Sequence, residues 1–281
     1  MSKIYFDELV NAVENLVHAC SSLTPACKSA LCRAKAGETN ANARFALDTI
    51  LSNAELAERE DLPVCQDTGM AVFFVEYGNG VQFVGDFEDA INEGVRRGYA
   101  KFGYRASVLD PVTRVNTRDN TPAVVHTKIV NGDAIKISFM AKGFGSENMS
   151  RLYMLTPSAG MDGVKNAILD AVKKAGSNPC PPIVVGVGIG GTAEKAMQVA
   201  KEELLRDVGN QNPDDTLAQL EKELLEDINA LGIGAQSFGG ANTALAVHIG
   251  KYPTHISALP VAVNVQCHAV RTASVTLEGR E

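Results

Sequence analysis

The stretch Leu62-Pro63-Val64-Cys65-Gln66-Asp67-Thr68-Gly69 places a thiol, an amide and a carboxylate on consecutive residues and ends at a glycine. Its proline disfavours a helix at the residue ahead of it, and its glycine frees the backbone just after the polar residues. We therefore expect Cys65, Gln66 and Asp67 to lie on a tight, non-helical turn. Functional side chains are frequent on turns that rigid elements brace. A buried cysteine beside an Asp-type turn is the alternative interpretation.

The composition is that of a soluble globular protein. The chain has 281 residues, 45% hydrophobic and 21% charged, enough to bury a sizeable core as one large domain or two. A net charge of −7 without any basic run argues against a nucleic-acid partner, and an anionic substrate would need a local positive pocket. No apolar run approaches the roughly 18 residues of a transmembrane helix, and residues 1–8 lack the pattern of a signal peptide. We expect a cytoplasmic protein without a membrane partner.

The six cysteines fall into two sets. In a reducing compartment they are thiols, metal ligands or redox groups rather than disulfides. The first set lies in a helical region among Ala and Leu, which predicts small buried hydrophobic side chains; it comprises Cys20, Cys27 and Cys32. The second set lies beside Pro- or Gly-rich breaks at the ends of predicted elements; it comprises Cys65, Cys180 and Cys267.

Hydrophobic periodicity and turn residues predict helices first and strands afterwards. Residues 6–20, 25–37 and 40–59 have helical spacing and no obvious chemistry, and Thr24-Pro25 supplies an N-cap followed by proline. Residues 71–76 and 81–84 are predicted to pair across Gly78-Asn79-Gly80, and residues 123–130 and 134–140 across Asn131-Gly132. Further helices are expected over residues 86–101, 162–174 and 214–231, and strands before Gly186, through His248 and from Leu259.

Two glycine-rich segments suggest ligand binding. The exit of the second predicted hairpin, Lys142–Asn148, would let backbone amides approach an anion. The glycines at positions 186, 188 and 191 match the Gly-x-Gly-x-x-Gly pattern of dinucleotide-binding proteins, so an NAD-dependent oxidoreductase is the alternative from another class. Against it, no strand ending in an acidic residue follows about 20 residues later, because Glu202 and Glu203 lie within a predicted helix.

Spacing does not assign a shared metal site to Cys65, Cys180 and Cys267, since no zinc or ferredoxin pattern has such distant cysteines. Three thiolates would nevertheless have a distinctive chemistry. Four cysteines saturate a cubane iron–sulfur cluster, whereas three leave one iron open to water or substrate. That iron would act as a Lewis acid rather than as an electron carrier.

Four separated motifs, in order, resemble the class I, iron–sulfur-dependent fumarate hydratases. The motifs are residues 63–69, Lys142–Asn148, Cys180-Pro181-Pro182 with the following glycine-rich turn, and Leu259 through Cys267. The resemblance covers nearly the whole chain and is closest to the alpha subunit of the two-subunit form. It implies a 4Fe–4S cluster held by Cys65, Cys180 and Cys267. It also implies a dicarboxylate site lined by Gln66, Asp67, Arg105, Gly145 and His255, with catalytic roles for Asp67 and His255.

The chemistry of these residue types agrees with reversible hydration of fumarate. Arg105 suits a bidentate clamp on a carboxylate, although a surface ion pair is its other interpretation. His255 can take part in proton transfer near neutral pH, and a structural histidine is its alternative. Gln66 and Asp67, next to a predicted ligand, can orient substrate or support the cluster, and the Gly145 amide can donate to a negative oxygen. His126, His248 and His268 are interpreted as structural.

We expect an α+β fold in a single hydro-lyase domain over residues 1–281, with a helical arm (1–60) and a mixed sheet flanked by helices (61–281). Its two lobes would meet at the cluster. Single-chain members of the family continue with a second domain after the third cysteine, whereas this chain ends at Glu281. A separate beta subunit, in a heterotetramer, is therefore expected to complete the site. L(+)-tartrate dehydratase alpha subunits share the cysteine motifs, but residues 146–148 and 190–194 look more like the fumarase branch.

Overall fold

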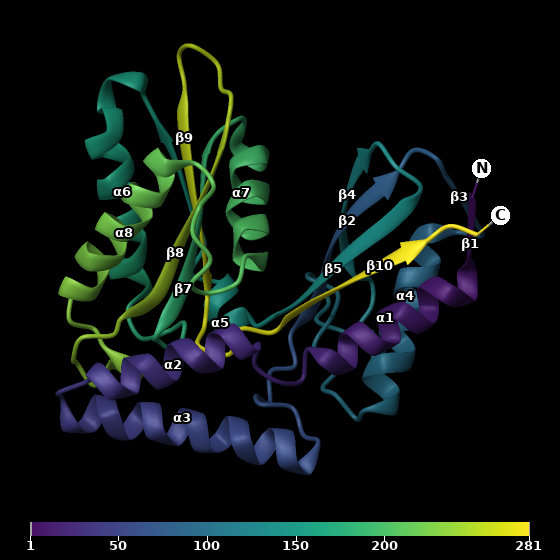
Figure 1. The fold of residues 1–281 in the computed structure, drawn as a ribbon, viewed down its shortest axis with the longest axis horizontal. Helices are drawn as coiled ribbons and strands as arrows, with labels where there is room; N and C mark the ends of the chain where they lie inside the picture. Colours follow the sequence, from purple (N-terminus) through teal and green to yellow (C-terminus); the bar gives the residue numbers. More distant parts are fainter. Residues whose placement is uncertain (1, 281) are drawn as a thin grey trace. The chain divides into compact units, whose positions relative to one another are not determined.

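The computed structural model describes residues 2–280 and divides the chain into two compact units (Figure 1). Among the described residues, unit 1 comprises 2–23, 57–144 and 271–280, and unit 2 comprises 24–56 and 145–270. Each unit contains a four-stranded mixed sheet with helices packed on it, so the expected α+β class is confirmed. The predicted helical arm does not form one group, because residues 2–23 belong to unit 1 and residues 24–56 to unit 2.

Unit 1 is built on a sheet of order β10-β5-β2-β4. Strand β5 is antiparallel to both its neighbours, whereas β2 and β4 are parallel. A separate parallel pair joins β1 to β3. The elements of this unit are β1 (Ser2–Tyr5), α1 (Phe6–Ala19), β2 (Met70–Gly78), β3 (Val81–Val84), α4 (Phe87–Lys101), β4 (Val124–Val130), β5 (Ala134–Lys142) and β10 (Thr272–Glu278).

Both predicted hairpins are wrong, although their strands exist. Strand β3 pairs with β1 rather than with β2, and β2 lies between β4 and β5. Burial explains the second difference: the run Ala71–Val75 in β2 is buried on both faces and needs a neighbour on each side. Strand β4 has no buried residue, and its Ile129 is 75% accessible, so it suits an edge. The two predicted turns instead contact each other, where Gly80 N donates to Gly132 O at 2.7 Å.

The helices of unit 1 pack through small residues. The buried stripe of α1, which includes Val13 and Val17, lies against α4. A Cβ at Gly94 would lie 2.6 Å from Val13 Cβ, and one at Gly98 would lie 2.9 Å from Val17 Cβ. Glycine is therefore required at both α4 positions for the helices to approach so closely.

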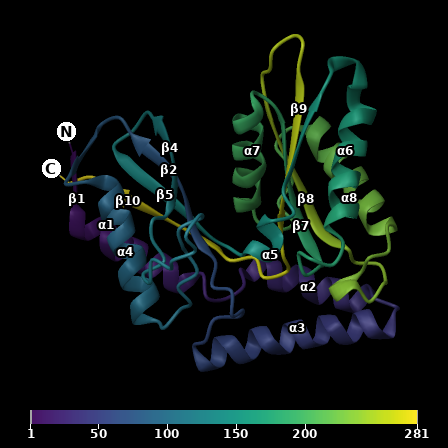
Figure 2. The same ribbon diagram turned by 180° about the vertical axis from the view of Figure 1, so that it is seen from behind.

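Unit 2 is built on a sheet of order β6-β9-β7-β8, in which β7 is parallel to β8 and antiparallel to β9. Figures 1 and 2 show α6 and α8 on one face of this sheet and α7 on the other. Its elements are α2 (Pro25–Gly37), most of α3 (Ala41–Glu60), most of α5 (Phe144–Glu147), β6 (Arg151–Leu155), α6 (Gly160–Ala175), β7 (Ile183–Gly190), α7 (Ala193–Glu202), α8 (Asp215–Ala230), β8 (Ala244–Tyr252) and β9 (Leu259–Gln266). Three short 3₁₀ turns complete it: η1 (Pro157–Ala159), η2 (Glu203–Leu205) and η3 (Ala235–Ser237).

The glycines that match the dinucleotide pattern have a packing role here. Gly186 and Gly188 lie inside β7 beneath α7 and η2. A Cβ at Gly188 would lie 2.8 Å from Ala200 N, and one at Gly186 would lie 2.8 Å from Leu204 Cγ. Gly186 and Gly188 thus let the helix rest directly on the strand, and Gly191 has φ +72°, so each of the three positions needs glycine without a nucleotide.

The three cysteines of the first set differ in burial. Cys20 and Cys27 are buried, as predicted, but Cys32 is exposed. The buried stripe of α2 consists of Cys27, Ala30, Leu31 and Ala34. Cys32 is five residues after Cys27 and therefore points away from that stripe. Its prediction as a buried side chain was wrong because helical phase, not local composition, decides which face is covered.

Candidate active site

The predicted turn at Cys65 is non-helical, as expected, and it is anchored within unit 1. Gly69 has φ +83°, and a Cβ there would lie 2.7 Å from Ala141 C and 2.8 Å from Lys142 N. Only glycine fits this approach to the end of β5. Cys65 and Asp67 are half-buried on the turn, and Gln66 is exposed.

Buried polar side chains hold the turn beside the segment that carries Arg105. Tyr99 Oη donates to Gly69 O at 2.8 Å, and Asn120 Nδ2 donates to the same oxygen at 3.2 Å. Thr68 Oγ1 donates to Arg105 O at 3.2 Å. Burial raises the pKa of Tyr99, which keeps its hydroxyl protonated as a donor. Unit 1 thus places the Cys65 turn next to the backbone of Arg105, whose side chain is exposed.

The Asp67 carboxylate and carbonyl are both fixed by hydrogen bonds. Oδ1 accepts from Gly69 N at 3.0 Å, and Oδ2 accepts from Phe144 N at 2.9 Å. The carbonyl oxygen accepts from Arg271 Nη1 at 2.8 Å, and Arg271 is only 1% exposed. A Cβ at Gly143 would lie 3.2 Å from Asp67 Oδ2, so the glycine leaves room for the carboxylate.

Arg271 was missed by the sequence reasoning. The signal available was a single arginine between apolar Val270 and a strand, four residues after Cys267. Charged residues are seldom fully buried unless they are paired, so an arginine in such a run is unusual. Only the structure shows that its partner is the carbonyl of Asp67.

In unit 2, hydrogen bonds join the loops of Cys180 and Cys267. Cys180, at φ +53°, precedes β7, and Cys267 directly follows β9. Cys180 O accepts from His268 N at 3.4 Å, and His268 Nδ1 lies 2.9 Å from the same oxygen. Cys180 is exposed and Cys267 is half-buried. Because β7 and β9 are antiparallel, both cysteines lie at the same end of the sheet.

Gly145 lies at the cysteine end of this sheet, whereas His255 does not. A Cβ at Gly145 would lie 3.3 Å from Asn178 O, two residues before Cys180. His255 lies on the exposed turn between β8 and β9, with Nδ1 2.7 Å from Ser257 Oγ. The eight residues of β9 separate this turn from Cys267, a span of about 26 Å at the usual rise per strand residue. One chain therefore brings Gly145, Cys180 and Cys267 together and leaves His255 at the opposite end.

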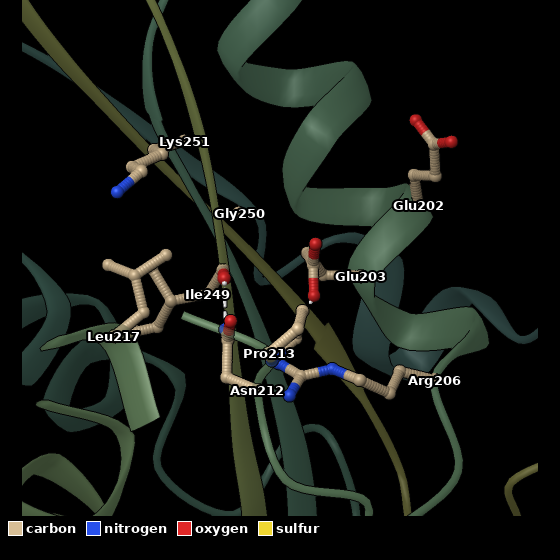
Figure 3. Close-up of a pocket in the computed structure, with 9 residues that line it drawn as sticks. All are labelled: Glu202, Glu203, Arg206, Asn212, Pro213, Leu217, Ile249, Gly250 and Lys251. Atoms are coloured by element: carbon tan, nitrogen blue, oxygen red, sulfur yellow. Dashed lines mark hydrogen bonds and ion pairs between the residues drawn. The ribbon is translucent and has the colours of Figure 1, made fainter. Parts of the chain in front are cut away.

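A hollow of about 390 Å³ lies in unit 2 near the C-terminal end of β8 (Figure 3). Its polar groups bind one another: Arg206 pairs with Glu203 at 3.1 Å, and Asn212 Nδ2 donates to Ile249 O at 2.8 Å. Glu221 accepts from Arg206 and from Ile249 N. Burial raises the pKa of Glu203. This hollow is at the sheet end opposite the two cysteines and contains none of the predicted site residues.

The thiols of the second set suit a soft metal better than the two buried thiols of the first. Burial raises the pKa of both Cys20 and Cys27 to about 12, so these thiols stay protonated and make poor ligands. The half-buried or exposed cysteines of loops are the type of donor that iron–sulfur clusters use. Cys180 and Cys267 therefore fit two positions of such a group. Cys65 belongs to the other unit, and within residues 2–280 no group of three or more His, Cys, Asp or Glu side chains is assembled for a metal.

The described residues contain neither a disulfide nor a membrane-spanning helix. All six cysteines, which lie within residues 2–280, are free thiols. Within the same residues, every helix is too short or too polar to cross a membrane.

Comparison with known proteins identifies the family. The family model described as fumarate hydratase (Fumerase) matches residues 10–276. The putative L(+)-tartrate dehydratase subunit alpha of Methanocaldococcus jannaschii is 41% identical over 254 residues, covering 87% of this chain and 88% of that protein. The L(+)-tartrate dehydratase subunit alpha of Escherichia coli strain K12 is 31% identical over 249 residues, covering 87% and 82%. The chain therefore belongs to the fumarate hydratase (Fumerase) family of hydro-lyases, as a close relative of L(+)-tartrate dehydratase alpha subunits.

Proposed function

We propose that this chain is the alpha subunit of a hydro-lyase that interconverts fumarate and L-malate, and that Cys65, Cys180 and Cys267 hold its 4Fe–4S cluster. One observation carries the proposal: in a member of the fumarate hydratase family, His268 joins the loops of Cys180 and Cys267 at one end of a sheet. Cys65 is the remaining cysteine on a fixed, non-helical turn. When bound, such a cluster supplies a Lewis acid at the iron that has no cysteine ligand.

Asp67 is proposed to bind the substrate hydroxyl and to handle its proton. Each carboxylate oxygen accepts one backbone hydrogen bond, from Gly69 or from Phe144, and keeps a second lone pair for substrate. These two bonds fix the direction of the carboxylate before substrate arrives. Such preorganisation is what a proton-transfer group requires.

The two carboxylates of the substrate require donors. We assign one to the exposed guanidinium of Arg105, which can bind a carboxylate with two parallel hydrogen bonds. Gln66, exposed on the Cys65 turn, and the backbone amide of Gly145 supply neutral donors. Gly145 directly follows Phe144, whose amide holds Asp67.

His255 is assigned to the site of a second copy of the chain. In its own chain it lies at the opposite end of β9 from Cys267. A residue that acts at the cluster must lie within hydrogen-bond reach of the substrate, which a separation of about 26 Å does not allow. An exposed turn that also presents Ile256, 89% accessible, is suited to insert into another subunit.

A beta subunit is proposed as the partner, in a cytoplasmic heterotetramer. Support comes from the relatives. They are named as alpha subunits, and their similarity to this chain extends over most of their length. The purified alpha chain with reconstituted cluster is expected to show little turnover until the beta subunit is added. Full activity from the alpha chain alone would contradict this partner.

L(+)-tartrate dehydration is the second candidate, and the names of the relatives favour it. Two of the residues by which the sequence resembles the fumarase branch, Ser146 and Glu147, bind or pack within unit 2. Ser146 is buried, and Glu147 pairs with Lys201 and accepts from Asn264 Nδ2 at 3.1 Å. The contacts of Ser146 and Glu147 are therefore within the protein, and these two residues do not by themselves favour fumarate over tartrate.

The test compares substrates on the assembled, anaerobically prepared complex. We expect a brown protein that forms fumarate from L-malate with a kcat/KM well above that for L(+)-tartrate. A pocket built to pair the additional hydroxyl of tartrate would reject malate by orders of magnitude. A preference for tartrate would therefore replace the first candidate by the second. A colourless protein without hydro-lyase activity would refute both.

A further inference from the structure

Gln236 binds the residues that follow each of the two cysteines of unit 2. Its backbone N donates to Pro181 O at 2.8 Å, and its side-chain Nε2 donates to the same oxygen at 2.9 Å. The same Nε2 lies 3.2 Å from His268 Nδ1. Pro181 follows Cys180 and His268 follows Cys267 in the sequence. One residue thus connects both cysteine loops.

The backbone at Gln236 is strained. Gln236 has φ 49° and ψ 26°, and the next residue, Ser237, has φ 63°. Residues other than glycine pay an energetic cost in this left-handed region and are held there only when their surroundings fix them. Here the conformation directs both the amide N and the side chain of Gln236 to the oxygen of Pro181. Such strain concentrates at functional sites.

The second cysteine loop is fixed from other directions as well. His268 N donates to Cys180 O, and the imidazole lies between this carbonyl and the Gln236 amide. Behind the loop, Cys27 Sγ donates to His268 O at 3.1 Å, and Cys27 is fully buried. The backbone of His268 is thereby held on both sides.

We propose that Gln236 is a positioning residue that sets the separation of the Cys180 and Cys267 thiols before any metal binds. The inference rests on the proposed function for the identity of the two thiols as ligands, but the positioning is a property of the apo chain. A carboxamide suits the task because Nε2 carries two hydrogens: one serves Pro181 O, and the other can serve His268 Nδ1 in the tautomer that carries its proton on the other ring nitrogen. Residues that orient ligands in this way typically change metal affinity 10- to 100-fold when they are replaced.

The test uses the apo chain with Cys32→Ser, which removes the exposed thiol of α2, and dibromobimane as the probe, because thiols placed for two different irons of a cubane are too far apart to share one bridging atom. This reagent forms two carbon–sulfur bonds, one at each end of a small ring system, and releases two bromide ions. After alkylation, mass spectrometry shows which cysteines were protected. We expect protection of Cys180 and Cys267 together, with Cys65 alkylated.

Three variants separate the effect of the Gln236 side chain from that of the strained backbone and from the loss of any glutamine. Gln236→Ala should slow this capture of both thiols at least about tenfold, equivalent to ~1.4 kcal/mol of activation free energy. Gln236→Gly also lacks the amide side chain but adopts φ 49° without strain, so it should fold and still slow capture. Gln219→Ala on α8 is the matched control, because Gln219 is exposed and binds only Glu223 on its own helix in the described structure; it should match the parent.

Capture by Gln236→Gly equal to that of the parent, in a folded chain, would overturn the inference. Failure of the parent to protect Cys180 and Cys267 together would also overturn it. The outcome is independent of hydro-lyase activity. An inactive complex whose apo chain shows the expected capture pattern would refute the proposed function alone, and an active complex with an unaffected Gln236→Gly would refute the positioning role alone.

Discussion

Arg271 Nη1 donates a 2.8 Å hydrogen bond to the carbonyl oxygen of Asp67, and the two residues lie 204 positions apart in the sequence. The guanidinium is fully buried within unit 1. Its Nε has no hydrogen-bond partner among residues 2–280. A buried cation with an unsatisfied nitrogen is costly for stability, so we infer that its contribution is to the position of the Asp67 turn.

Replacing Arg271 by methionine should therefore affect catalysis more than stability. Without the Nη1 bond the Asp67 turn can shift, and a displacement of about 1 Å is enough to lower kcat on the order of 100-fold. The free energy of unfolding should change little, since removing a buried charge avoids its desolvation cost. The measurement is kcat, KM and iron content of the assembled complex.

Arg97→Met is the matched control for that experiment. Arg97 is exposed on α4, where it pairs with Glu93, so its loss should leave kcat unchanged and lower stability by no more than about 0.5 kcal/mol. Equal losses of activity in the two variants, or loss of iron in Arg271→Met with normal kcat per cluster, would show that Arg271 does not act through Asp67.

His248 should make the protein less stable in mild acid. Burial, with the nearby charge of Arg206, lowers the pKa of His248 to about 4, and Nδ1 lies 3.1 Å from Glu203 O. The unfolded chain takes up this proton near pH 6.5 and the folded chain only near pH 4, so stability is complete above about 6.5 and falls as the pH is lowered. The loss is on the order of 3 kcal/mol by pH 4.

Urea titrations of the parent and His248→Asn at pH 7.5 and 4.5 measure this effect. The asparagine keeps a donor for Glu203 O and does not titrate, so the difference between the two pH values should be smaller in the variant. An identical pH dependence in both proteins would exclude His248 as its source.

Glu203 should have the opposite dependence on pH. Burial raises the pKa of this carboxyl despite the nearby Arg206. A raised folded-state pKa means that the group contributes stability at low pH, which is lost as the pH rises through that value. Glu203→Gln should therefore raise the melting temperature relative to the parent at pH 7.5 more than at pH 4.5. A lower melting temperature at pH 7.5 would show that the ion pair with Arg206 outweighs the cost of burial.

Much of the local structure could be predicted from the sequence. Thr24 caps α2 by accepting from Cys27 N, and Asp86 caps α4 by accepting from Asp89 N. Such caps depend on residues three positions apart, so a sequence pattern contains them. Strand pairing could not be predicted in this way: Asn131-Gly132 is a good local hairpin signal, but burial of β2 on both faces places it between β4 and β5.

The roles of Gln236 and Arg271 in supporting the site could not be predicted from the sequence for a similar reason. Gln236 binds a backbone oxygen 55 positions away, and Arg271 binds one 204 positions away. Backbone oxygens leave no chemical signature in a sequence. By contrast, the turn of Cys65 was predictable, because Pro63 restricts the residue before it and Gly69 permits a positive φ.

The assignment of His255 to a second copy can be tested by mixing variants. Differently tagged His255→Ala and Cys267→Ser alpha chains are expressed together with the beta subunit and purified through both tags. If His255 acts in the neighbouring site, one of two symmetry-related sites stays intact and activity should return to roughly half. If His255 acted in its own chain, both sites of the mixed complex would be defective and activity would stay at the level of the single variants.

The cluster assignment is tested most directly by the iron content of single cysteine variants of the assembled complex. Cys65→Ser, Cys180→Ser and Cys267→Ser should each lose the visible absorption of the cluster, most of the bound iron and hydration of fumarate. Cys32→Ser, which replaces an exposed thiol outside the proposed site, should keep all three. Normal iron and absorption in any one of the first three variants would contradict the account.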